Sequence, residues 1–355
     1  MKHFSNHLIN WYKQHKRELP WRKTTDPYTI WVSEIIMQQT QIITGLPYYN
    51  RFMQAFPTIT DLAQASINEV LKLWEGMGYY SRARNMHETA LFLTNTNNGI
   101  FPSDKKEIDK LKGIGPYTSA AIASISFNQP YAVVDGNVYR FLSRLYGIST
   151  PIDSSQGKKE FTTLAQSLLA NEQPGTFNQA MMEMGALICK KASPQCNDCP
   201  FVKNCIAYKN KSIEKFPVKN KSIKQKQRYF IFLIIGDNNQ ILIEQRNHKD
   251  IWQGLYQFPC IETNFIINKT DATNLIISNF VKLPNHISPK LIAEGTYLLT
   301  HQKLNILFYQ VKILTKELID FHNNSVFSLI SFGDLNKYAF PKPFHLVLKQ
   351  LKNTF

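Results

Sequence analysis

Apolar side chains recur at intervals of three and four residues through much of the first 200 positions. The spacing is clear at residues 30–53, 62–73 and 161–169, and glycine or proline separates these stretches. Such spacing puts the apolar side chains on one face of a helix, where a neighbouring helix can cover them. We therefore predict an all-helical domain over residues 1–205.

From Tyr229 the pattern changes to short β-rich runs. YFIFLIIG (229–236), NNQILIEQ (238–245) and KLNILFYQVKI (303–313) are separated by turns that contain glycine or asparagine. These runs predict strands, and residues 271–280 and 344–351 are compatible with helices. Residues 229–355 should therefore form a second, α+β domain, which makes the chain multidomain.

Residues 206–228 contain few large apolar side chains, and we expect a basic linker between the domains. The stretch 203–228 carries nine basic side chains and one acidic one, so it holds eight of the fifteen net positive charges. A basic run is often a solvated linker, but it also suits contact with nucleic-acid phosphates. Both interpretations stay open.

The sequence predicts neither a membrane-spanning helix nor a secretory signal. No run of eighteen apolar residues occurs, and the N-terminal stretch is amphipathic and charged, with no secretory apolar core. Only five cysteines occur, and Cys260 stands apart from the other four. This usage fits a reducing compartment, so we expect a cytoplasmic protein.

The other four cysteines follow the spacing C-x6-C-x2-C-x5-C in residues 189–205. Thiols this close together in a chain of this size favour a shared soft-metal site over disulfides. The intervals differ from those of a zinc ribbon, which pairs two C-x2-C units across a longer loop. A zinc knuckle is the alternative.

Two glycines punctuate LKGIGPYTSAAIAS (111–124). Gly113 and Gly115 allow a tight turn, after which the backbone N–H groups of the next helix can point at a phosphate. Such binding does not depend on base sequence. An ordinary connection between helices is the alternative.

Two carboxylates lie in apolar stretches, where burial is costly unless the group has partners or a task. Asp135 lies in VVDGNVYRFLSRL (133–145) and could be a helix N-cap. Glu34 lies in WVSEIIMQQTQI (31–42), where desolvation should raise its pKa and suit it to act as an acid near neutral pH. A capping box does not fit Glu34, because Trp31 is a poor cap.

Together these strings resemble the MutY family of adenine DNA glycosylases, within the helix-hairpin-helix, iron–sulfur DNA glycosylase superfamily. The resemblance implies that Glu34 protonates the adenine and that Asp135 stabilises positive charge developing on the deoxyribose. It also implies a [4Fe–4S] cluster. Its ligands would be Cys189, Cys196, Cys199 and Cys205.

Further motifs match the family's DNA-binding segments. Gln38, Gln39 and Thr40 match the segment that enters the duplex where the base has left the stack. Arg22, in LPWR, and Tyr79, in WEGMGYYSRARN (74–85), match residues near the adenine and beside the lesion. Arg82 and Arg84 would suit phosphates, as would Lys112, where the family usually has proline. Glu183 could face the active site or the solvent.

One position separates two chemistries within the superfamily. Bifunctional members, which also cleave the backbone, carry a lysine just after the hairpin, where this chain has Tyr117. A phenol cannot form the Schiff base that β-elimination requires. We therefore expect a monofunctional enzyme, in which Tyr117 lies near the sugar and supports Asp135. Asn137, in VDGN, likewise matches the MutY form.

Residues 229–355 resemble the Nudix-related domain of the same family, most clearly in QRNHKDIWQGLYQFP (245–259). The acidic cluster that holds magnesium in Nudix hydrolases is missing, so nucleotide hydrolysis is not expected. The family recognises 8-oxoguanine through a Phe-Ser-His loop. Its counterpart here is Leu299, Thr300 and His301, with leucine in place of phenylalanine.

The resemblance implies hydrolytic removal of adenine opposite 8-oxoguanine or guanine, by a monomer acting on double-stranded DNA. Two alternatives are an endonuclease III-like bifunctional pyrimidine glycosylase and lyase, and a non-catalytic iron–sulfur protein that binds DNA. Tyr117 argues against the first, and the presence of both Glu34 and Asp135 argues against the second. Protein partners cannot be named from the sequence.

Overall fold

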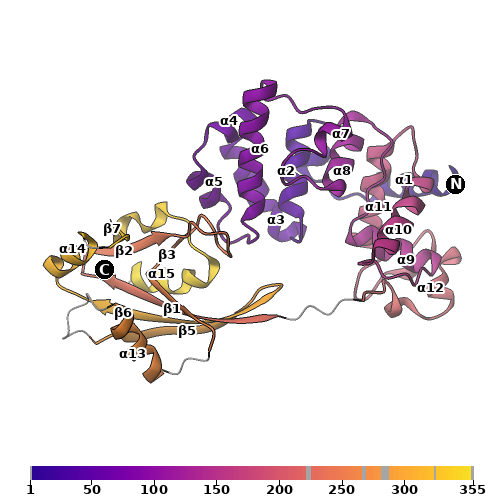
Figure 1. Ribbon diagram of the computed structural model, residues 1–355. Coiled ribbons are helices and arrows are strands. Elements are labelled where there is room, and N and C mark those ends of the chain that lie inside the picture. Colours follow the sequence, from indigo (N-terminus) through magenta and orange to yellow (C-terminus); the bar gives the residue numbers. More distant parts are fainter. Residues whose placement is uncertain (1, 221–224, 266–268, 281–287, 324, 353–355) are drawn as a thin grey trace. The chain divides into compact units, whose positions relative to one another are not determined.

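The computed structural model describes residues 2–220, 225–265, 269–280, 288–323 and 325–352 (Figure 1). Two compact units make up the chain. The first consists of Met1–Gln64 and Asn85–Ser222, and the second of Ala65–Arg84 and Ile223–Phe355. The chain therefore passes between the units after Gln64 and after Arg84, and again between residues 220 and 225.

The first unit is helical. Its elements are α1 (Lys2–His15), η1 (Pro20–Arg22), α2 (Pro27–Met37), α3 (Ile42–Ala55), α4 (Ile59–Gln64), most of α6 (Ser81–Asn97), α7 (Lys105–Ile108), α8 (Pro116–Phe127), α9 (Gly136–Tyr146), α10 (Ser155–Leu168), α11 (Pro174–Leu187), η2 (Cys196–Asp198), η3 (Val202–Asn204), α12 (Ile206–Lys209) and η4 (Ile213–Lys215).

Helix α2 shows how local sequence sets these boundaries. The Asp26 carboxylate accepts the Thr29 backbone N–H at 2.7 Å, and Pro27 occupies the first turn. The helix ends at Met37, and Gln39 follows with a φ of +57°. A left-handed residue cannot continue a right-handed helix. The apolar stretch 30–53 therefore forms two helices, α2 and α3.

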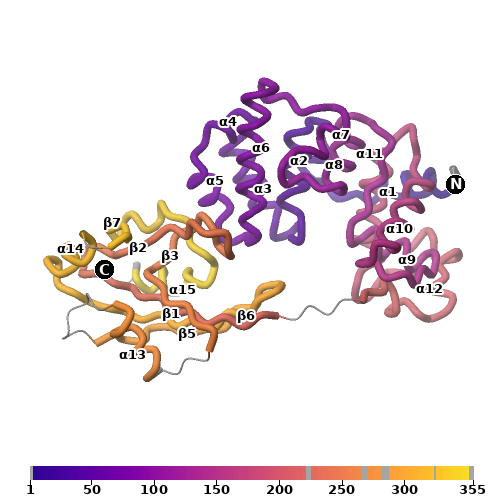
Figure 2. The backbone as a smooth tube through the Cα atoms, in the orientation of Figure 1, coloured from indigo at the N-terminus to yellow at the C-terminus, as the bar shows by residue number. Residues whose placement is uncertain are grey.

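A core of large side chains joins helices α1, α9, α10 and α11 of this unit. Helix α11 packs against α1, α8 and α9, as the backbone trace shows (Figure 2). Leu8, Phe141, Phe161, Phe177 and Met184 are each at most 2% exposed in this core. This packing holds α9 and one face of α11 in place, on which the site described below depends.

The second unit is built on a mixed sheet. Its elements are α5 (Ile67–Leu73), β1 (Lys226–Gly236), β2 (Gln240–Gln245), β3 (Tyr256–Gln257), β4 (Cys260–Thr263), α13 (Lys269–Asn279), β5 (Lys290–Leu298), β6 (Gln302–Lys312), α14 (Thr315–Asn323), β7 (Ser328–Ser331), η5 (Phe332–Lys337), η6 (Lys342–Phe344) and α15 (His345–Lys352).

Strand β1 is the centre of the sheet. It pairs in parallel with β6 and antiparallel with β2 and β4, and β5 pairs antiparallel with β6. Successive side chains point to opposite faces. Ile231 and Leu233 face a core shared with α13 and α14, while Phe232 packs against Phe344, with ring centroids 4.6 Å apart.

This architecture confirms the predicted fold class, a helical domain followed by an α+β domain. The strand runs at 229–236, 238–245 and 303–313 correspond to β1, β2 and β6, and the two stretches compatible with helices correspond to α13 and α15. Among the described residues, no helix is long and apolar enough to cross a membrane.

The domain boundaries differ from the expected ones. Residues 65–84, expected within the helical domain, group with the C-terminal unit, where Lys72 Nζ donates to the Tyr338 carbonyl oxygen at 2.8 Å. Much of the expected linker 206–228 instead folds onto the helical unit, and the Ile152 N–H donates to the Val218 carbonyl oxygen at 3.0 Å. Residues 221–224 lie outside the described residues. Hydrogen bonds between residues far apart in the chain, which apolar spacing does not reveal, accompany both differences.

Candidate active site

A pocket of about 1110 Å³ opens in the helical unit. It is bounded by the end of α2, the turn before α3, the N-terminal ends of α8 and α9, and one side of α11. The predicted site residues that line it are Arg22, Glu34, Gln38, Gln39, Thr40, Gly113, Gly115, Tyr117, Asp135, Asn137 and Glu183. The fold thus brings together residues that are far apart in the chain, since Arg22 and Glu183 are separated by 161 positions.

Glu34 lies in the last turn of α2, and its carboxylate lines the pocket. Tyr117, in the first turn of α8, donates its hydroxyl hydrogen to Glu34 Oε2 at 2.7 Å. Desolvation raises the pKa of Glu34 to about 7, the Tyr117 hydrogen bond opposes this shift, and the charge of Asp135 adds to it. The result is a carboxyl group that can hold a proton near neutral pH.

Asp135 is the N-cap of α9, as the alternative interpretation of the sequence held. Its Oδ1 accepts the backbone N–H groups of Asn137 and Val138 at 2.9 and 2.8 Å, and its Oδ2 accepts Asn137 Nδ2 at 2.7 Å. Burial raises the pKa of Asp135, and these hydrogen bonds oppose the shift. The carboxylate therefore caps a helix and lines the pocket at once.

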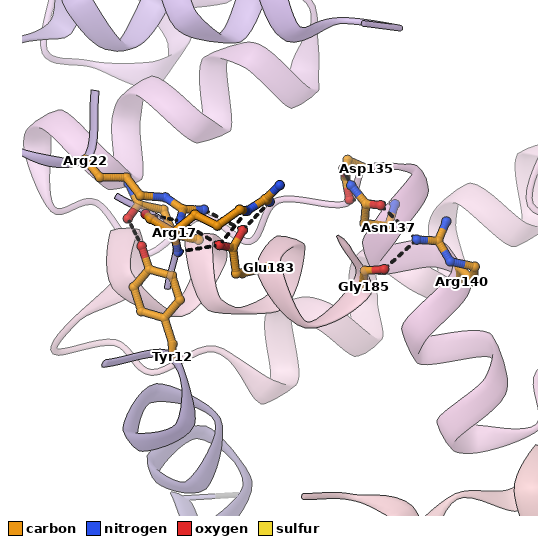
Figure 3. Close-up of polar contacts among 9 residues, drawn as sticks. Tyr12, Arg17, Arg22, Asp135, Asn137, Arg140, Glu183 and Gly185 are labelled. Carbon is orange, nitrogen blue, oxygen red and sulfur yellow. Dashed lines mark hydrogen bonds and ion pairs between the residues drawn. The ribbon is translucent and has the colours of Figure 1, made fainter. Parts of the chain in front are cut away.

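Asn137 connects Asp135 to the next turn of α9. Arg140 donates to Asn137 Oδ1 at 2.8 Å and to the Gly185 carbonyl oxygen at 2.6 Å (Figure 3). Its Nε donates to the Cys189 carbonyl oxygen at 2.6 Å. Arg140 was not among the residues expected from the sequence, although its position five residues after Asp135 on the same predicted helix was a usable signal.

Glu183, on α11, is buried, and its carboxylate is paired with arginines. It is 1% exposed and lies between two arginines (Figure 3). Arg22 donates to both of its oxygens, at 2.8 and 2.7 Å, and Arg17 contacts it at 2.9 and 2.5 Å. Burial opposes ionisation, but the two arginines hold the pKa of Glu183 at about 2.

The positive charge of Arg22 is therefore paired with Glu183, although Arg22 also lines the pocket. It also lies over the Tyr12 ring, 5.4 Å from the centroid. Arg17 was not predicted from the sequence, because it belongs to a charged stretch that contains no recognisable motif.

The turn between α2 and α3 carries the three residues expected to enter the duplex. Gln38 Nε2 donates to Thr118 Oγ1 at 3.1 Å, whereas Gln39 is exposed and has a positive φ. Thr40 Oγ1 donates to the Gln38 carbonyl oxygen at 3.3 Å. Hydrogen bonds of Gln38 and Thr40 therefore stabilise this turn, which lines the pocket.

The hairpin joins α7 to α8 through the two glycines. Gly113 has a φ of +78°, and a Cβ atom there would lie 2.6 Å from Asn85 Cβ. Gly115 is the N-cap of α8, and a Cβ atom at this position would have no neighbouring atom within 4 Å. Lys112, beside them, forms an ion pair with Glu88.

The four clustered cysteines line one cavity of the helical unit, together with Arg144 and Phe201. All four thiols are free, and Arg144 Nη1 lies 3.6 Å from Cys189 Sγ. Among the described residues, no three His, Cys, Asp or Glu side chains are grouped as ligands of a single metal ion. The donor set, four thiols and a nearby guanidinium around one cavity, fits a cofactor that is bound by several thiolates.

The remaining predicted contact residues belong to the second unit. Tyr79 is 47% exposed, and its hydroxyl oxygen lies 2.6 Å from Thr300 Oγ1. Thr300 and His301 are exposed in the turn between β5 and β6. Arg82 stacks over the Trp74 and Tyr79 rings, and Arg84 donates to the Gln253 carbonyl oxygen at 2.6 Å. The two arginines thus support the loop from within.

Two family models match the chain. Residues 32–167 match the HhH-GPD superfamily of base excision DNA repair proteins, and residues 230–350 match the NUDIX domain. Among solved structures, the chain is similar to a thermostable thymine-DNA glycosylase, with a TM-score of 0.54 and 29% identity over 59% of this chain and 96% of that one. A trapped endonuclease III–DNA intermediate, at 23% identity and a TM-score of 0.51, shares the fold.

Similar curated proteins extend over both domains. The adenine DNA glycosylase of Buchnera aphidicola subsp. Acyrthosiphon pisum is 38% identical over 81% of this chain and 86% of its own length. That of Buchnera aphidicola subsp. Baizongia pistaciae is 34% identical over 98% and 97%. The adenine DNA glycosylase of Rattus norvegicus is 44% identical over 58% of this chain and 42% of its own length. On its sequence and its two domains, this chain belongs to the family of adenine DNA glycosylases.

Proposed function

We propose that this protein removes adenine paired with 8-oxoguanine, or with guanine, by hydrolysing the N-glycosidic bond. Membership of the family makes it a base excision repair glycosylase. The observation that carries the detailed proposal is the pair of Glu34 and Asp135 on one pocket wall, with a Glu34 pKa of about 7.

In this mechanism, Glu34 donates its proton to the adenine ring as the bond between the sugar and the base breaks. The electron pair of that bond leaves with the adenine, and the sugar acquires oxocarbenium character. The Asp135 carboxylate stabilises this charge, as carboxylates do in glycosidases. Water then adds to the sugar and gives a proton to Glu34, which leaves an abasic site and restores the acid.

Tyr117 and Asn137 position the two carboxyl groups. Tyr117 holds the Glu34 carboxyl through its hydroxyl, and Asn137 holds Asp135 through its side-chain amide. A tyrosine in place of a lysine offers no amine for a Schiff base. The protein should therefore stop at the abasic site without cleaving the backbone.

DNA contact is assigned to four parts of the chain. The hairpin around Gly113 and Gly115 would bind phosphate through backbone N–H groups. Gln38, Gln39 and Thr40 would fill the space that the extruded adenine leaves, because extrusion costs a few kcal/mol and the gap must be supported. Tyr79, Thr300 and His301 would contact the opposite base, and the basic residues 203–228 would contact phosphates. The protein would act as a monomer on nucleoid DNA in the cytoplasm.

The four thiols around the cavity would hold a [4Fe–4S] cluster. When bound, such a cluster links the loop of residues 189–205 to the end of α11 and supplies rigidity near the basic stretch. The catalytic steps above do not pass through it.

The test is excision from duplexes that carry adenine opposite 8-oxoguanine, guanine or cytosine, measured under single-turnover conditions. We expect the fastest release of adenine opposite 8-oxoguanine, and no release by Glu34→Gln although that variant still binds the duplex. Borohydride should trap little covalent adduct. Efficient trapping would contradict the monofunctional assignment, and normal excision by Glu34→Gln would contradict the mechanism.

A further inference from the structure

The loop that carries Tyr79 is held by the C-terminal unit at several points. Gln245 Nε2 donates to Asn68 Oδ1 at 3.0 Å, and Arg84 donates to the Gln253 carbonyl oxygen at 2.6 Å. These contacts lie at the two ends of the segment Ala65–Arg84, which groups with the C-terminal unit. A segment held at both ends loses little further entropy when it contacts a ligand.

Glu75 makes the central anchor of this segment. Its Oε1 accepts the Phe340 backbone N–H at 2.8 Å, and its Oε2 accepts Lys72 Nζ at 2.6 Å. His345 Nε2 lies 3.6 Å from Oε1, an ion pair when the ring is protonated. The Glu75 side chain is 18% exposed, so these interactions are partly shielded from water.

The charge of Glu75 is maintained by its donors. Burial alone would raise the pKa of Glu75, but its interactions with His345, Lys72 and the Phe340 N–H bring it below its usual value. Lys72 extends the anchor, because its ammonium also donates to the Tyr338 carbonyl oxygen. One carboxylate thereby ties α5 to the chain that precedes α15.

Directly after Glu75 the chain forms a tight, internally bonded turn. Gly76 and Gly78 have φ angles of +89° and +76°, and Tyr79 itself has a φ of +49°. Trp74 Nε1 donates to the Gly78 carbonyl oxygen at 3.0 Å, and the Gly76 N–H donates to the Tyr80 hydroxyl at 3.0 Å. A displacement of Glu75 would therefore move Tyr79 with the whole turn.

At its tip, the turn meets the loop between β5 and β6. The Tyr79 and Thr300 hydroxyl oxygens are 2.6 Å apart. The Thr300 loop is itself fixed by β1, because the Lys226 N–H donates to the His301 carbonyl oxygen at 2.9 Å and Arg228 donates to Gln302 Oε1 at 3.1 Å. Both sides of the Tyr79–Thr300 contact thus rest on the C-terminal unit.

We propose that Glu75 is a positioning residue for discrimination of the base opposite the adenine. It holds the turn so that Tyr79 and Thr300 act as one recognition element. The inference rests on the proposed function, in which this element contacts the opposite base. Glu75 itself would touch neither the DNA nor the reacting atoms.

The test compares Glu75→Gln with Glu69→Gln in the full-length protein. Both changes remove one carboxylate from the same segment, but Glu69 is exposed and only caps α5, a role that glutamine also fulfils. The measured quantity is the rate of adenine excision opposite 8-oxoguanine divided by the rate opposite guanine. This ratio should fall about fivefold in Glu75→Gln, which is about the effect of one weakened charge-assisted hydrogen bond. It should not change in Glu69→Gln.

Combining Glu75→Gln with a second substitution distinguishes a role in positioning Tyr79 from a general effect on stability. In Tyr79→Phe, which lacks the hydroxyl that meets Thr300, adding Glu75→Gln should lower the ratio no further. The proposal would be overturned if Glu75→Gln lowered the ratio as much in the Tyr79→Phe background as in the unmodified protein. It would also be overturned if Glu75→Gln lowered both excision rates equally and left their ratio unchanged.

Hydrogen exchange of residues 74–84 provides a readout that is independent of catalysis. Exchange should be faster in Glu75→Gln and unchanged in Glu69→Gln. If the unmodified protein shows no preference for 8-oxoguanine, the substrate part of the proposed function is wrong. Unchanged exchange in Glu75→Gln would instead refute the role of Glu75.

Discussion

The Glu34 carboxyl group is shaped by opposing effects of its neighbours. Desolvation and the charge of Asp135 favour its protonated form, whereas the Tyr117 hydroxyl favours its ionised form. The balance puts its pKa at about 7. An acid with such a pKa can donate a proton at neutral pH and accept one back later in the same reaction.

The pH dependence of adenine release should report this balance. In the proposed mechanism Glu34 donates a proton, which it carries below pH 7, so the single-turnover rate should fall about tenfold per pH unit above about 7. In Tyr117→Phe the ionised form loses its donor, so the pKa of Glu34 rises and the descending limb moves to higher pH. The measurement is the rate from pH 5 to 9.

Tyr12→Phe is the control for this shift, because the Tyr12 hydroxyl donates to Gln179 Oε1 at 2.7 Å instead of to Glu34. Its midpoint should match that of the unmodified protein. A limb that moves to lower pH in Tyr117→Phe would show that the hydroxyl does not stabilise the ionised carboxylate.

Glu183 should contribute strongly to stability. Glu183→Gln leaves Arg17 and Arg22 without their anion, and breaking a buried ion pair typically costs about 3 kcal/mol of the free energy of unfolding. Most of this loss should come from Arg22, which is 9% exposed, because water screens Arg17, which is 35% exposed. Urea unfolding of Glu183→Gln measures the loss, with the exposed Glu160→Gln as the control.

Acid should produce a related effect. The folded-state pKa of Glu183, about 2, lies below the ordinary value of 4.5, so its contribution is complete above pH 4.5. The contribution should disappear as the pH falls from 4.5 toward 2. If Glu183→Gln were as stable as Glu160→Gln at pH 7, the ion pairs would not contribute net stability.

At the scale of elements, the site is an assembly of helix ends. The pocket receives the C-terminal part of α2, the first turns of α8 and α9, and a side of α11. Turns with special backbone geometry set these ends, notably at Gln39 and Gly113, which both have positive φ angles. Single substitutions in such turns should therefore affect a whole helix end.

The two glycines of the hairpin allow this prediction to be tested, because only Gly113 has a positive φ. Gly113→Ala should cost about 2 kcal/mol of the free energy of unfolding, because an alanine there is strained at a φ of +78° and its Cβ meets Asn85. It should also weaken binding to duplexes of any sequence. Gly115→Ala should change stability by less than about 0.5 kcal/mol, since its φ is −92° and the space is open.

Urea unfolding and binding to a duplex without a lesion measure the two effects. Equal stability of the two variants would mean that the hairpin does not need the left-handed residue. Loss of affinity for only some DNA sequences would contradict phosphate binding by the backbone.

At the scale of the whole molecule, neither of the two units is a single continuous stretch of the chain. Residues 65–84 are flanked in sequence by the helical unit but group with the sheet unit. Residues 206–220 were expected to be linker, but they fold onto the helical unit, where Ile206 lies against Gly147. The cysteine cavity lies in the same unit, between α9 and the end of α11.

If the four clustered cysteines hold the proposed cluster, loss of one of them should destabilise the helical unit. Cys199→Ser should lower the iron content and the temperature of unfolding, because a cofactor bound only by the folded state stabilises that state. Cys260→Ala, in the sheet unit, should retain the iron. Iron analysis and thermal unfolding of the purified proteins check this, and full iron content in Cys199→Ser would contradict the assigned ligands.

The two domain classes, strands β1, β2 and β6, helices α13 and α15, and the family could all be predicted from the amino-acid sequence. Periodicity records which face of an element is buried, and the motifs around Glu34, Gly113, Asp135 and the cysteines are local in the chain. The sequence also indicated a raised pKa for Glu34, since apolar neighbours within one helix already imply desolvation.

The meeting of distant side chains became visible only in the folded chain. The burial of Glu183 between Arg17 and Arg22, the hydrogen bond from Tyr117 to Glu34, and the anchoring of Glu75 on Phe340 join residues 83 to 265 positions apart. No local pattern encodes such pairs, because they depend on how helices and strands pack. Packing also determined that Ala65–Arg84 belongs with the sheet, since its polar groups find their partners there.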